Sequence, residues 1–105
     1  MNLLQGTLDL LILRTLKGGP LHGWAISERI QEVSEDVLTV NQGSLYPALH
    51  RLEHQGWIKA EWATSELGRR ARFYHLTHSG KGQLELESKS WKTLTVAIDR
   101  VMKLA

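Results

Sequence analysis

The spacing of apolar residues changes in the middle of this 105-residue chain, and this change constrains the fold more than any other feature. Before it, Leu45, Leu49 and Leu52 recur three or four residues apart, the spacing that places side chains on one face of a helix. From Trp57 onward, apolar and polar residues alternate, which is typical of a half-buried strand. The sequence therefore predicts a helix over about residues 42–55, followed directly by β structure.

The β structure is predicted to be an antiparallel hairpin with a basic end. A second strand covers about residues 72–76, and the segment between the strands contains Gly68, which suits a turn. Arg69, Arg70 and Arg72 lie at the loop end of the hairpin. A run of charges is most often a solvated surface, but arginine also binds phosphate well because its guanidinium is a rigid cation with several donors.

Two further helices are expected upstream of the hairpin. The first has an apolar face made of Leu4, Leu8, Leu11, Ile12 and Leu16, and the Gly-Gly-Pro run at 18–20 ends it. The second runs from residue 21 or 22 to residue 33. Residues 34–40 then form a connector, with room for a short strand at 37–40.

The helix over residues 42–55 can be capped by either of two residues. Ser44 as the N-cap places Pro47 in the first turn, where proline is tolerated. Asn41 as the N-cap places Pro47 further inside, and the helix must then bend slightly. The sequence leaves both alternatives open.

Thr77 is suited to cap a last helix that continues to the end of the chain, over about 29 residues and roughly 43 Å. Its apolar residues have near-heptad spacing, which produces a narrow stripe that packs against another helix. This helix could fold back on the first one, but it would project past a three-helix core, which favours self-association. The expected dimer-interface residues are Leu84, Trp91, Leu94, Ile98 and Val101.

The composition excludes several classes of protein. The chain has no cysteine, which rules out disulfides and fits a reducing cytoplasm, the expected location. No apolar run approaches the ~20 residues needed to span a bilayer, so no membrane association is expected.

We find no phosphate loop, nucleophile elbow or metal-ligand cluster, and therefore expect neither an enzyme nor a cofactor. His50 and His54 lie one helical turn apart, but no third ligand is near in sequence, so no metal is expected.

The expected fold is mainly α with a small β-hairpin (α+β): a winged helix-turn-helix over residues 1–76, and a C-terminal dimerisation helix over 77–105. In such folds the second helix of the motif enters the major groove of DNA and the hairpin, or wing, reaches the adjacent backbone. The candidate DNA-binding residues are Asn41, Gln42, Ser44, Tyr46, Pro47, His50, Arg51, Arg69, Arg70 and Arg72. Tyr46 is equally suited to be a half-buried core aromatic. The alternative function is a winged-helix module that binds protein and no DNA.

Three segments also resemble the PadR family of bacterial transcriptional regulators: LDLLILRTLKGGPLHGWAISERI, NQGSLYPALHRLEHQGWI and GRRARFYHLTHSGK. The resemblance covers essentially the whole chain, and the LYPAL-RLE--G pattern within it is the most distinctive part. It implies a winged helix-turn-helix homodimer that binds a palindromic operator in double-stranded DNA, usually as a repressor. It places the DNA contacts in residues 41–51 and around residues 68–72. The single C-terminal helix implies the shorter form of the family.

The resemblance also implies that a small aromatic effector could act on the protein. Some short members bind flat aromatic molecules between paired tryptophans of the C-terminal helices, and Trp91 occupies the matching place. Plain hydrophobic packing of Trp91 is the alternative, and is somewhat favoured.

Overall fold

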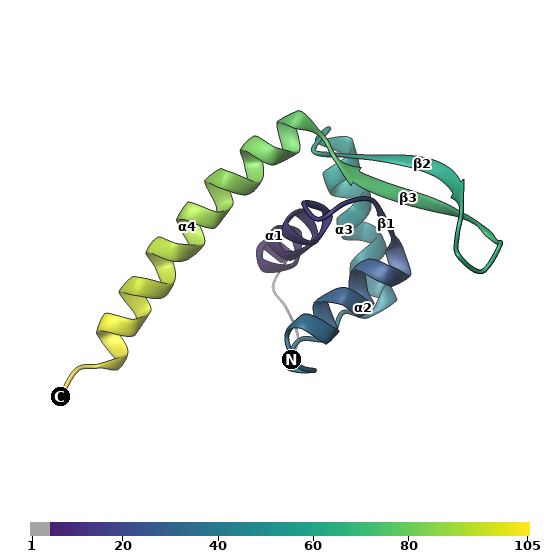
Figure 1. The fold of residues 1–105 in the computed structure, drawn as a ribbon. Helices are drawn as coiled ribbons and strands as arrows, with labels where there is room; N and C mark the ends of the chain where they lie inside the picture. Colours follow the sequence, from purple (N-terminus) through teal and green to yellow (C-terminus); the bar gives the residue numbers. More distant parts are fainter. Residues whose placement is uncertain (1–4) are drawn as a thin grey trace.

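The structure is a computed structural model that describes residues 5–105 (Figure 1). Its elements, in chain order, are α1 (Gln5–Leu16), β1 (Leu21–His22), α2 (Gly23–Val33), α3 (Gln42–His54), β2 (Ile58–Thr64), β3 (Arg70–Leu76) and α4 (His78–Met102). The expected fold class, mainly α with a winged helix-turn-helix and a long last helix, is confirmed. The expected apolar position at Leu4 lies outside the described residues. No helix in the described part of the chain has the length and hydropathy needed to cross a bilayer.

The core forms where α1, α2 and α3 meet beneath the sheet. The predicted apolar stripe of α3 is confirmed, because Leu45, Leu49 and Leu52 are each at most 1% exposed. Leu13 was not part of the predicted stripe of α1, yet it is fully buried. This helix packs against α2, α3 and α4, so more than one of its faces is covered.

The sheet has three strands in the order β1-β3-β2, not two as the sequence predicted. Leu21 pairs with Tyr74 and His22 with Phe73, so α2 begins only at Gly23. A two-residue strand is too short to show an alternating pattern, which is why the sequence did not reveal it. The short strand considered at 37–40 is absent from the described structure.

Asn41 is the N-cap of α3, which decides between the two alternatives that the sequence left open. The Ser44 N–H donates to Asn41 Oδ1 over 2.9 Å, and the Leu45 N–H donates to the Asn41 carbonyl over 3.0 Å. Pro47 therefore lies inside α3. Since proline has no N–H, the Gly43 carbonyl lacks the helical hydrogen bond that a different residue would supply.

Thr77 caps α4, as predicted, and also joins it to the end of α3. The hydroxyl of Thr77 accepts a hydrogen bond from the Gly80 N–H over 3.0 Å and donates one to the Gly56 carbonyl over 2.7 Å. Gly80 packs so closely on the Trp57 carbonyl that a Cβ there would overlap it. The first turn of α4 is thus held against the start of the hairpin.

Beyond its first turns, α4 leaves the rest of the fold, as Figure 1 shows. The radius of gyration is 15.0 Å, against about 13 Å for a compact domain of this length. Leu84, one of the expected dimer-interface residues, is 5% exposed and belongs to the core of its own chain. Since α4 contacts α1, Leu84 helps to anchor the helix within its own chain and presents little surface to a second copy.

Candidate nucleic-acid interface

The N-terminal half of α3 presents a polar surface to solvent. Its leucines are directed into the core, which leaves the opposite face exposed. The exposed residues of this face are Gln42, Gly43, Ser44, Tyr46, Pro47 and His50. Asn41, which was expected to contact DNA, is exposed as well, but its Oδ1 atom is engaged in capping the helix.

Tyr46 lies across the start of α2 and remains 43% exposed. A Cβ atom at Gly23 would lie 3.1 Å from the Tyr46 hydroxyl oxygen and 3.2 Å from its Cε1 atom. Such distances are tighter than ordinary van der Waals contact, so the absence of a side chain at Gly23 permits this approach. Gly23 and Tyr46 therefore help to set how α3 lies against α2.

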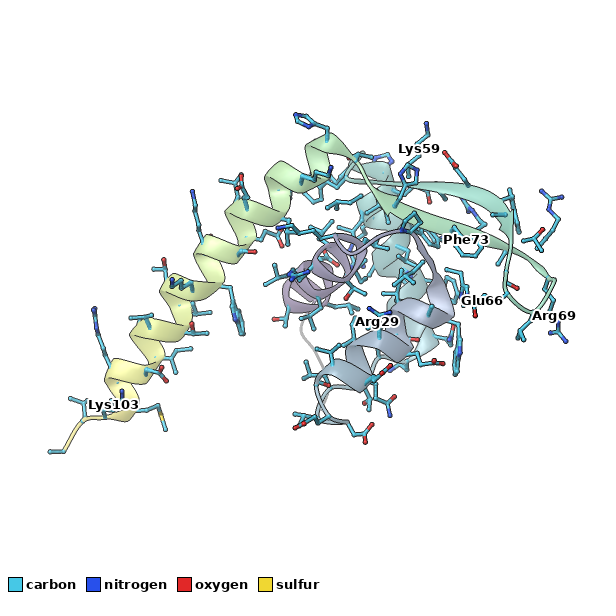
Figure 2. The ribbon with its side chains drawn as sticks, in the orientation of Figure 1. Arg29, Lys59, Glu66, Arg69, Phe73 and Lys103 are labelled. Carbon is cyan, nitrogen blue, oxygen red and sulfur yellow. The ribbon has the colours of Figure 1, made fainter. Side chains whose placement is uncertain are left out.

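The hairpin, called the wing from here on, is fixed to the start of α2 through His22. The His22 ring contacts the Phe73 ring edge to face, with 5.5 Å between the ring centroids. Its Nδ1 atom accepts a hydrogen bond from the Ala25 N–H over 3.2 Å, which caps α2. Phe73 lies on β3 beside this helix in Figure 2. A single side chain thus links the wing to the helix that precedes α3.

The tip of the wing is a structured turn. The Ser65 N–H donates to the Arg69 carbonyl over 2.7 Å, and the Gly68 N–H donates to the Ser65 carbonyl over 2.9 Å. Gly68 has φ +78°, a conformation that favours glycine over any residue with a side chain. This turn holds Arg69 at the outer end of the wing (Figure 2).

Arg69 and Arg70 are exposed, and neither forms an ion pair within the described residues. The guanidinium of Arg70 lies 5.4 Å from the centroid of the Trp62 ring, a cation–π contact. Trp62 is itself 61% exposed. The sequence predicted Trp62 to lie in a strand but did not indicate that it lies beside the arginines. The signal that could have revealed its position is the antiparallel register, which pairs Trp62 with Arg72 and so places it on the face that bears the arginines.

Arg72 differs from the two arginines at the tip because it has an acidic partner. Its Nη2 atom donates to Glu53 Oε2 over 3.0 Å, and its guanidinium lies 5.8 Å from the centroid of the Tyr74 ring. Burial raises the pKa of the Tyr74 hydroxyl, and the nearby charge of Arg72 opposes this. The side chain of Arg72 thus ties the wing to α3.

Arg51 is also paired, on the side of α3 that faces α1. Its Nη2 atom donates to Asp9 Oδ1 over 2.9 Å. Burial raises the pKa of the Asp9 carboxyl, while the hydrogen bond and charge of Arg51 act in the opposite direction. The two arginines expected to contact DNA at positions 51 and 72 therefore hold α3 in place within this chain.

The wing also carries an exposed lysine on the face opposite to Trp62. Lys59 is exposed and alternates with Ala60 along β2, so it lies on the face opposite to Trp62. Figure 2 shows its side chain directed away from the helices. The wing therefore has two exposed arginines near its tip, and Lys59 on the opposite face can serve as a control cation for them.

Comparison with known proteins agrees with this fold. The sequence model of the "Transcriptional regulator PadR-like family" matches residues 12–86. A transcriptional regulator from Mycobacterium tuberculosis is 36% identical over 64 residues, which are 61% of this chain and 59% of that protein.

Solved structures are also similar. A transcriptional regulator from Clostridium thermocellum has a TM-score of 0.86 and 27% identity, over 94% of this chain and 96% of that one. A PadR-like transcriptional regulator from Bacillus cereus has a TM-score of 0.83 and 26% identity, over 96% of each chain.

Proposed function

Because the chain belongs to the PadR-like family of transcriptional regulators, which bind DNA and are not enzymes, we propose that it is a homodimeric repressor of a palindromic operator. One observation carries the proposal. The exposed polar start of α3 is accompanied by a wing whose Arg69 and Arg70 lack acidic partners among the described residues. The other two arginines of this region are already paired within the chain.

On the basis of these contacts, we propose different roles for the residues of α3 and of the wing. Gln42, Ser44 and His50 carry hydrogen-bonding groups suited to base edges in the major groove, where each base pair has its own donor and acceptor pattern. Arg69 and Arg70 are suited to phosphate or to the adjacent groove. Tyr46 and Pro47 complete the surface that meets the DNA, and Asn41 sets the start of the helix.

The chain is proposed to consist of a DNA-binding domain over residues 1–76, called the reading domain, and a dimerisation helix over residues 77–105. The dimer is proposed to form through α4. The stripe made of Trp91, Leu94, Ile98 and Val101 is 46–63% exposed in the single chain. Apolar side chains spaced in this way favour burial against an equivalent stripe. Two-fold symmetry would then present one α3 and one wing to each operator half-site.

A flat aromatic effector is proposed to enter beside Trp91. A shallow pocket of about 360 Å³ lies between α1 and α4, lined by Leu10, Glu87, Trp91 and Leu94 among others. A planar dye that binds there would quench tryptophan fluorescence, and Trp91→Ala would abolish the quenching. The other tryptophans also emit, so quenching that persists in the variant means that the dye binds elsewhere and Trp91 only packs.

The test of DNA binding starts with selection of bound fragments from a genomic pool, followed by titration of the selected fragment at several salt concentrations. The double variant Arg69→Ala/Arg70→Ala should weaken binding and reduce the slope of log affinity against log salt by about two, since each lost phosphate contact releases fewer counterions. Lys59→Ala, on the other face of the same hairpin, should leave the slope unchanged. An unchanged slope in the double variant contradicts the role of the wing. Failure to select any DNA at low salt would favour a protein-binding module.

A further inference from the structure

A second, strongly basic hollow lies outside the proposed DNA interface. It is formed where the end of α1 passes beside the first turns of α4, and its volume is about 700 Å³. Its charged and polar lining includes Arg14, Lys17, His78, Lys81, Glu85 and Lys89. This volume is within the range of small-molecule sites, about 300–1,000 Å³.

The charge of this hollow is not balanced within the chain. Arg14, Lys17, Lys81 and Lys89 are basic side chains, positively charged at neutral pH, and Glu85 is the single carboxylate of the lining. Glu85 forms no ion pair with Lys81 or Lys89 within the described residues, although both lie one helical turn away. The four cations therefore repel one another across a concave surface.

The position of the cations on the two helices is a second indication. Arg14 and Lys17 lie at the end of α1, where cations suit the negative end of the helix dipole. His78 and Lys81 lie at the start of α4, where the dipole favours anions, and the first turn of this helix has no acidic residue. An anion in the hollow would relieve this local conflict. Charges placed against a helix dipole, as at the start of α4, are expected mainly at functional sites.

The hollow stays accessible when the stripe of α4 is covered. Glu85 and Lys89 lie roughly 160° around α4 from the mean direction of the stripe of Trp91, Leu94, Ile98 and Val101, at 3.6 residues per turn, and Lys81 lies roughly 120° from it. The pocket beside Trp91 is lined by a different set of α4 residues. A second copy seated on the stripe would therefore leave Glu85 and Lys89 of the hollow uncovered.

From these observations we infer that the α1–α4 hollow binds a small multivalent anion of the di- or triphosphate class. Lysine and arginine both bind phosphate, and several cations converging from two helices match several phosphate charges. The hollow is lined by residues from the end of α1 and from α4. Figure 1 shows the wing extending from the opposite side of the fold to α4, so an operator bound at the wing is not expected to occupy the hollow. An anion held by both helices would also fix the angle between α4 and the reading domain. This regulatory consequence, unlike the binding itself, rests on the proposed function.

The test uses calorimetric titration of the full chain with sodium tripolyphosphate at 0.15 M salt. We expect saturable binding of one anion per chain, weakened at least about tenfold by Lys17→Ala/Lys81→Ala, since each lost charge-assisted contact removes a strong interaction. Lys103 is a cation at the far end of α4 (Figure 2), so the control variant Lys103→Ala should bind tripolyphosphate as the unmodified chain does. The absence of saturable binding, or equal weakening by Lys103→Ala, overturns the inference.

Two further variants distinguish an anion bound in the hollow from one bound at the wing. A Cβ at Gly82, which lines the hollow, would meet no atom within 4 Å, so Gly82→Glu adds a carboxylate without a clash and should abolish tripolyphosphate binding in a folded chain. Arg69→Ala/Arg70→Ala should bind tripolyphosphate normally. If the wing variant loses the anion and the hollow variants keep it, the anion binds at the DNA interface and the inference is wrong. If the unmodified chain binds tripolyphosphate but selects no DNA at low salt, that result counts against the proposed function alone.

Discussion

Arg72 of the wing donates a hydrogen bond to Glu53 of α3 over 3.0 Å, and this pair connects the two elements proposed to meet DNA. The side chains are 38% and 32% exposed, so water weakens their attraction. We expect Arg72→Ala and Glu53→Ala each to lower the free energy of unfolding by about 0.5–1 kcal/mol, measured by urea denaturation. The double variant should lose less free energy of unfolding than the two single variants lose together. Additive losses would show that the two side chains are not coupled.

Gly80→Ala should be strongly destabilising, by about 2 kcal/mol or more, because the added Cβ would overlap the Trp57 carbonyl and push α4 off the start of the wing. Gly82→Ala is the matched control on the same helix. Its Cβ meets nothing within 4 Å, so the better helix propensity of alanine should stabilise the chain by up to about 1 kcal/mol. Thermal unfolding of both variants checks this, and similar effects of the two would contradict the close contact at Gly80.

Gly23→Ala should change how α3 is held more than it changes stability. The new methyl would lie 3.1 Å from the Tyr46 hydroxyl oxygen, and the half-exposed ring has room to move away. We expect a loss of stability below about 1 kcal/mol, together with weaker operator binding measured by fluorescence anisotropy. Tyr46→Phe, which keeps the ring and removes only the hydroxyl, should partly restore binding in the Gly23→Ala background. A Gly23→Ala variant with unaltered affinity would show that this contact does not position α3.

The pH dependence of stability should carry a contribution from Asp9. Burial raises the pKa of its carboxyl above the ordinary value of 3.8, so the folded chain holds this proton more tightly than the unfolded chain. The free energy of unfolding should therefore fall as pH rises from 3.8 through the higher pKa of folded Asp9. Asp9→Asn removes this decline, so the stability of the original chain relative to the variant should decrease across the same window. An increase would mean that the attraction of Arg51 outweighs burial.

The proposed dimer should depend on one face of α4. Ile98→Asp, on the stripe, is expected to give a folded monomer in light scattering, since a charge in an apolar seam is strongly unfavourable. Val96→Asp is the matched control, because Val96 is 41% exposed and lies roughly 160° around α4 from Ile98. Dissociation by both variants, or by neither, would contradict the proposed seam.

Much of the fold could be predicted because its signals are local. The spacing of Leu45, Leu49 and Leu52 determined α3 and its buried face, and Thr77 determined where α4 begins. The alternation after Trp57 determined the hairpin. The capping of α3 was harder, because both Asn41 and Ser44 suit the role; the observed hydrogen bond to Asn41 decides it.

The candidate site divides in the same way. From the sequence, Arg51, Arg69, Arg70 and Arg72 were equivalent cations, and only the tertiary structure separated the paired from the unpaired. The partners of Arg51 and Arg72 lie 42 and 19 residues away in the chain, so no local pattern contains them. For the same reason, the burial of Leu84 depends on contact with α1, not on its place in a heptad-like stripe. Helix and strand periods follow from the local geometry of the backbone, whereas ion pairs and burial depend on which distant segments the fold brings together.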